Sequence, residues 1–84
     1  MCTYVIERAV VTGSGKGPAG WFELETASVY LDHSPRSDAE HTLNIDFLNP
    51  GLGAAARVAV ELTPESARRL VAAIEAALEA ETAP

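Results

Sequence analysis

Apolar and polar side chains alternate along residues 41–48 and again along residues 57–62. The apolar positions of the first segment are Leu43, Ile45 and Phe47, and those of the second are Val58, Val60 and Leu62. Successive side chains of a strand point to opposite faces of a sheet, so a period of two is typical of a half-buried strand. We therefore predict two β-strands joined by a turn at residues 49–53, where Asn, Pro and Gly gather.

Two further strands are predicted in the N-terminal half of the chain. Residues 3–12 and 21–31 are rich in β-branched and aromatic side chains, which favour extended structure. The alternation slips near residues 26–28, and we expect a β-bulge there. Residues 13–20 hold four glycines and a proline and are predicted to form a loop, as is the polar segment 32–40.

The C-terminal part of the chain has the period of an amphipathic helix that opens at Thr63. Thr63 can cap the first turn, Pro64 suits the first helical position because no N–H partner is needed there, and Glu65 complements the positive helix end. The positions spaced as one buried face are Ala67, Leu70, Val71, Ile74, Ala77 and Leu78. We expect the tail, residues 82–84, to fray.

The predicted order is β-β-β-β-α within a single domain, residues 1–84. Short connections favour antiparallel neighbours, so the expected fold class is α+β, a four-stranded antiparallel meander with the C-terminal helix packed on one face. Such a sheet is ~20 Å wide, whereas one helix covers ~10–12 Å. Because the first two strands carry apolar side chains on both faces, we predict a homodimer through the helix-free face or the edge of the sheet. A second possible contact is the Ala-rich flank of the helix: Ala72, Ala73, Ala76 and Ala80.

The formal net charge of −6 argues against nucleic-acid and anionic-membrane partners, because both require a basic surface. No run is long and apolar enough to span a membrane, and the first residues lack the pattern of a signal peptide. The one cysteine, Cys2, cannot form an internal disulfide, which agrees with a reducing compartment. These features predict a cytoplasmic protein.

Imidazole and carboxylate side chains gather in residues 32–41. His33 and His41 flank one loop if the adjoining strands form a hairpin, and Asp32, Asp38 and Glu40 lie between or beside them. Two imidazoles with a carboxylate suit zinc or another divalent transition metal. The spacing matches no compact metal motif, so we favour a solvated loop and predict neither a metal nor another cofactor.

Two other segments are candidates for binding a small ligand. Asn44 and Asp46 project to the polar side of one predicted strand, facing Arg57 and Glu61 of the next. An ion pair between Asp46 and Arg57 is expected, and the patch either orients a ligand or simply faces water, which we favour. The run Gly13-Ser-Gly-Lys-Gly17 has the Lys16 and glycines of a phosphate-binding loop but lacks the Walker spacing and a following helix. Next to this run, Trp21 could line a pocket.

Three stretches carry a family resemblance: Cys2-Thr-Tyr-Val-Ile-Glu-Arg, Gly13-Ser-Gly-Lys-Gly-Pro-Ala-Gly-Trp-Phe22 and Glu40-His-Thr-Leu-Asn-Ile-Asp-Phe47. In these the chain resembles a family of short uncharacterised actinobacterial proteins, over essentially its whole length. The resemblance implies no activity, cofactor or catalytic residue.

Three classes of function follow from these features. The leading hypothesis is a homodimeric ligand-binding or interaction module, with any ligand near Lys16, Trp21, His33, His41, Asn44 and Asp46. In such a module Trp21, Tyr30 and His41 would line one pocket between loops 13–20 and 32–41. The alternatives are a small metal-assisted enzyme that uses His33 and His41, and a structural partner of a larger protein.

Overall fold

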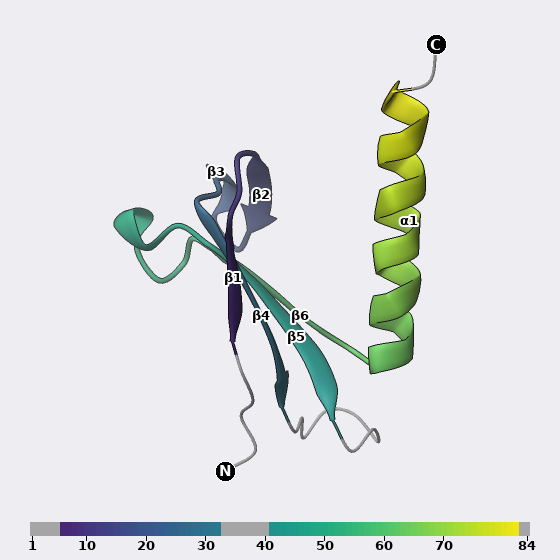
Figure 1. The fold of residues 1–84 in the computed structure, drawn as a ribbon. Helices are drawn as coiled ribbons and strands as arrows, with labels where there is room; N and C mark the ends of the chain where they lie inside the picture. Colours follow the sequence, from purple (N-terminus) through teal and green to yellow (C-terminus); the bar gives the residue numbers. More distant parts are fainter. Residues whose placement is uncertain (1–5, 33–40, 83–84) are drawn as a thin grey trace.

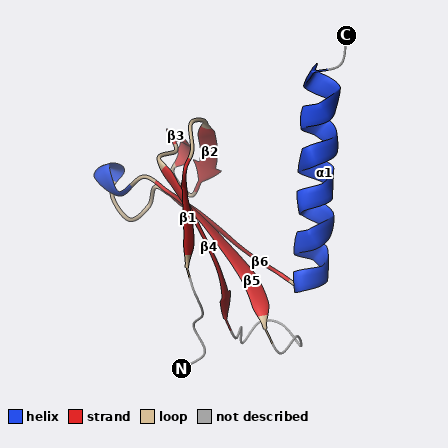
Figure 2. Ribbon diagram, in the orientation of Figure 1, coloured by secondary structure: helices blue, strands red, loops and turns tan. Residues whose placement is uncertain are grey.

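The computed structural model describes residues 6–32 and 41–82 (Figure 1). The elements follow the order β1 (Glu7–Val10), β2 (Ser14–Gly17), β3 (Gly20–Glu23), β4 (Thr26–Asp32), β5 (Thr42–Leu48), a 3-10 turn (Pro50–Leu52), β6 (Arg57–Leu62) and α1 (Pro64–Thr82). One sheet has the order β1-β4-β5-β6, with every neighbouring pair antiparallel, and β2 and β3 form a separate two-stranded sheet. The α+β class is confirmed (Figure 2).

The single four-stranded meander is wrong, because β2 and β3 form an inserted hairpin between β1 and β4. The predicted strand 21–31 is two strands that belong to different sheets. The N–H of Leu24 donates to the Gly13 carbonyl beside the hairpin, at 2.9 Å, whereas the N–H of Glu25 donates to the Leu48 carbonyl in the main sheet, also at 2.9 Å. The slip in alternation therefore marks a change of sheet. The pairing of β4 with both neighbours runs through residues 26–28 without an extra residue, so the predicted bulge is absent there.

Most of the predicted loop 13–20 is regular structure: residues 14–17 form β2, and residues 18–19 form the turn to β3. The glycines of β2 allow close approach to other parts of the chain. A Cβ atom on Gly15 would lie 2.9 Å from Cδ2 of Leu24 and 3.4 Å from Cγ2 of Val58. A Cβ atom on Gly17 would lie 3.2 Å from the carbonyl oxygen of Arg57 and 3.3 Å from that of Ala55. Glycine in a strand often marks such a contact. The hairpin therefore packs on the start of β6 and covers one end of the sheet.

The main sheet has one apolar face and one polar face, as the alternation predicts. The strand register aligns Val29 with Ile45 and Val60 across β4, β5 and β6, and these side chains share the apolar face. On the opposite face Tyr30 aligns with Asn44 and Glu61. The middle of the apolar face is not fully covered, since Val60 remains exposed.

The helix begins as predicted and then leaves the sheet. The Thr63 hydroxyl accepts a hydrogen bond from the Ser66 N–H at 3.1 Å, which confirms the N-cap. Ala67 is buried, but the larger side chains of the same helix face are 42–59% exposed: Leu70, Val71, Ile74 and Leu78. Figure 1 shows α1 standing apart from the strands beyond its first turns. A helix packed across one face is therefore wrong, because only the start of α1 reaches the sheet.

The protein is elongated as a result. Its principal extents are 46 × 31 × 21 Å, and its radius of gyration is 14.3 Å. A compact chain of this length has a radius of gyration of about 12 Å. The helix continues to Thr82, and residues 83–84 lie outside the described residues.

Candidate functional site

The candidate site lies on the polar face of the main sheet, where three adjacent strands each contribute side chains. Tyr30 comes from β4, Asn44 and Asp46 from β5, and Arg57 and Glu61 from β6. Because Asp46 pairs with Ala59 and Arg57 with Leu48, the side chains of Asp46 and Arg57 meet diagonally across the two strands. The small Ala59 leaves the space through which the guanidinium reaches the carboxylate.

Asp46 is the centre of the polar contacts. Nη2 of Arg57 donates to Oδ1 of Asp46 at 2.9 Å, and Nε of Arg57 lies 3.3 Å from the same oxygen. The Tyr30 hydroxyl donates to Oδ2 at 3.3 Å. The Asp46 side chain is 14% exposed and that of Arg57 53%. Asp46 thus fixes its neighbours, while part of the guanidinium surface stays exposed to solvent. The expected Asp46–Arg57 ion pair is confirmed.

A second polar contact stiffens the same face. The Thr42 hydroxyl donates to Oδ1 of Asn44 at 2.8 Å, and both residues are buried. Burial of polar side chains is tolerated when they are hydrogen-bonded. This contact fixes the orientation of the Asn44 amide beside the site.

An open hollow of about 500 Å³ adjoins these side chains. Its lining includes Tyr30, Asn44, Asp46, Arg57 and Glu61. A phenol, an amide, two carboxylates and a guanidinium provide donors and acceptors of both charge signs. Such a surface can hold a small polar molecule.

The other predicted site residues lie elsewhere. Lys16 of β2 pairs with Trp21 of β3, and both line an apolar hollow of about 320 Å³ together with Leu24, Phe47 and Val58. That hollow is on the apolar face, opposite Asn44 and Asp46. No helix follows Lys16, so the arrangement of a nucleotide-binding loop is absent there.

The histidine loop is only partly described. His41 directly precedes β5 and is half-buried, whereas His33, Asp38 and Glu40 lie outside the described residues. Among residues 6–32 and 41–82, no three potential ligands gather to hold a metal ion. The solvated loop that we favour and the alternative of a metal site with His33 and His41 therefore both stay predictions.

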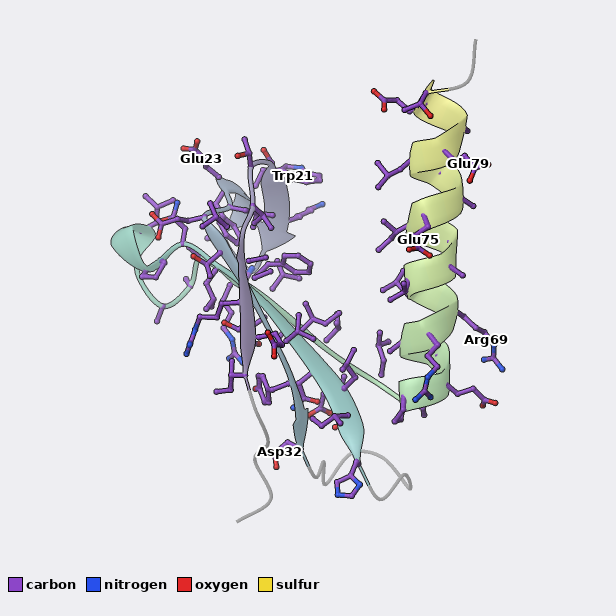
Figure 3. All side chains as sticks on the ribbon, in the orientation of Figure 1. Trp21, Glu23, Asp32, Arg69, Glu75 and Glu79 are labelled. Atoms are coloured by element: carbon purple, nitrogen blue, oxygen red, sulfur yellow. The ribbon has the colours of Figure 1, made fainter. Side chains whose placement is uncertain are left out.

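Trp21 and His41, which would line one pocket with Tyr30 in a ligand-binding module, lie apart in the described part of the chain. Trp21 belongs to the hairpin, which packs on the end of the sheet where β6 begins, whereas His41 and Asp32 lie at the other end of β4 and β5. Figure 3 shows Trp21 and Asp32 at opposite ends of the strands. A seven-residue strand spans ~23 Å, which separates the two regions.

The hydrogen bond from Tyr30 to Asp46 was not expected from the sequence, although Tyr30 was a candidate for lining a pocket. The strand register could have indicated this contact. Tyr30 pairs with Asn44, and Asp46 lies two residues further along β5, so Tyr30 and Asp46 share one face of the sheet. That register depends on where β4 begins, which the slip near residues 26–28 obscured.

Comparison with known proteins gives one match. The model of the Family of unknown function (DUF6295) matches residues 1–84. The chain belongs to this family. No curated protein and no solved structure matches the chain. Within the described ranges, α1 and the other helical segment both lack the combination of length and apolarity that crossing a membrane requires.

Proposed function

We propose that this DUF6295 member is an interaction module of the cytoplasm whose working form is a homodimer. The observation that supports this proposal is the helix: four large aliphatic side chains on one face of α1 are about half exposed. Single exposed apolar residues are ordinary on a protein surface, but a continuous apolar stripe along a whole helix is typical of a contact surface.

The exposed area supports a second copy as the partner. The chain exposes 6232 Å², whereas a compact monomer of its mass, 8.9 kDa, exposes about 4,800 Å². The excess of about 1,400 Å² is larger than the ~800 Å² that each partner buries in a standard interface. Half of this excess would already come close to the area that each partner buries in a standard interface. The chain itself is the one partner that is present whenever the protein is expressed.

Size-exclusion chromatography with light scattering tests the proposal on the full chain. We expect a mass of two chains at micromolar concentration and dissociation on dilution. A single-chain mass throughout the micromolar range would overturn the homodimer. Recovery of the chain only in complex with a different protein would favour the structural-partner hypothesis instead.

A second candidate function is the binding of a small polar molecule on the polar face. The hollow beside Arg57 and Glu61 favours it, because a cation and an anion on one surface complement a zwitterion such as a free amino acid. The test is a titration of the labelled protein with free amino acids at millimolar concentration, followed by amide chemical shifts. We expect shifts near Asn44 and Arg57 that disappear in Arg57→Ala, and unchanged spectra would exclude this class of ligand.

A further inference from the structure

Apart from Glu65 in the first turn, the charges along α1 are arranged against the dipole of the helix itself. Arg68 and Arg69 lie in its first half, whereas Glu75, Glu79 and Glu81 lie in its second half. The last turn contains no basic residue. A helix has a partial negative charge at its C-terminal end, so glutamates there destabilise an isolated helix. The glutamates therefore interact unfavourably with the dipole of α1, and a positive charge on a neighbouring chain would offset this interaction.

One flank of the aliphatic stripe carries charges of both signs. Arg68, Glu75 and Glu79 are spaced by seven and four residues, which places them on the same side of a helix. Arg69 lies on a different side, where its Nη2 is 3.7 Å from Oε1 of Glu65.

From these features, and resting on the proposed homodimer, we infer that two copies of α1 pair antiparallel about a twofold axis near Ile74. In that arrangement Leu70 lies beside Leu78 of the partner, and the two copies of Ile74 meet at the axis. Each Arg68 then lies beside Glu79 of the partner. The partner's N-terminal half also supplies positive charge next to the glutamates at the helix end.

The twofold axis makes the charge balance of this flank favourable. Each dimer then contains two Arg68–Glu79 contacts between opposite charges. The two copies of Glu75 approach each other near the axis, and this is the single contact between like charges. A parallel pairing would instead place Arg68 beside the opposite flank of the partner helix, which carries Ala73 and Ala77 and no acidic side chain, so the Arg68–Glu79 contacts would be lost. Unlike neighbours on paired helices set their relative orientation, so the antiparallel pairing is favoured.

A disulfide test locates the axis. In a Cys2→Ser background, Ile74→Cys should form a disulfide-linked dimer under mild oxidation, because the two thiols meet at the axis. Ala76→Cys in the same background is the matched control, since position 76 lies on the side of the helix opposite Ile74 and away from Arg68, so this thiol should stay reduced. Linked dimer with the control and none with Ile74→Cys would overturn the pairing.

Charge reversal tests the orientation. Arg68→Glu and Glu79→Arg should each weaken the dimer by about 3- to 10-fold, because two attractive contacts become repulsive. The double variant should restore the dissociation constant of the unaltered chain. A monomeric unaltered chain would overturn the proposed function as well. A stable dimer whose dissociation constant is unchanged by both single reversals would overturn the antiparallel pairing alone. So would a dissociation constant that the double variant raises further.

Discussion

The variant Ile74→Asp is expected to be monomeric at concentrations where the unaltered chain is a dimer. Ile74 is 50% exposed in the single chain, so an aspartate there keeps its hydration and changes the free energy of unfolding of an isolated monomer by less than about 0.5 kcal/mol. In the dimer the same carboxylate is buried without a partner, and an unpaired buried charge costs ~3–5 kcal/mol. Light scattering should therefore report at least a 100-fold weaker dimer.

Ala76→Asp is the matched control for this experiment. It adds the same charge two residues away, on the Ala-rich flank that was the alternative helix contact. If the aliphatic stripe forms the interface, Ala76→Asp should remain dimeric while Ile74→Asp is a monomer. The opposite result would assign the contact to the Ala-rich flank. Two dimeric variants would remove α1 from the interface, and two monomeric variants would extend the contact to both sides of the helix.

Local features of this fold could be predicted from the sequence because they depend on neighbouring residues. The start of α1 is one example: Thr63, Pro64 and Glu65 specify a helix end through side-chain chemistry within one turn. Strand β6 is another, because the alternation along residues 57–62 indicates an extended segment with two different faces, although Val60 on the apolar face is exposed. The Asp46–Arg57 ion pair followed from the same alternation, since it needed only the pairing of consecutive strands.

Other features required long-range information that composition does not contain. Glycine is used both for loops and for close approach of strands, so Gly15 and Gly17 predicted a loop although they form a strand packed on β6. The period of Leu70 and Ile74 shows that this helix face needs a partner but does not identify that partner. For the same reason the candidate site residues could not be grouped. Lys16 and Asn44 lie on opposite faces, and only the path of the inserted hairpin shows this.

The hairpin is expected to tolerate a side chain at Gly13 but not at Gly17. A Cβ atom on Gly17 would lie 3.1 Å from the Phe22 ring and near two backbone carbonyl oxygens, whereas one on Gly13 would have no heavy atom within 4 Å. Gly17→Val should therefore lower the free energy of unfolding by about 1–3 kcal/mol, since overpacked sites must shift backbone or side chains. Gly13→Val should change it by less than about 0.5 kcal/mol.

Urea unfolding followed by the fluorescence of Trp21 measures this difference inside the hairpin itself. Gly17 lies within β2 and Gly13 does not, so the β-propensity of valine favours the Gly17 variant. A lower stability of that variant therefore reports the contact with β6. Both variants must be compared at one protein concentration, because dissociation of a dimer contributes to its apparent stability. Equal unfolding midpoints would mean that β2 does not press on β6. The glycines would then matter for backbone flexibility, as in a loop, and not for packing. The fluorescence of Trp21 would in that case follow a hairpin that does not pack on the sheet.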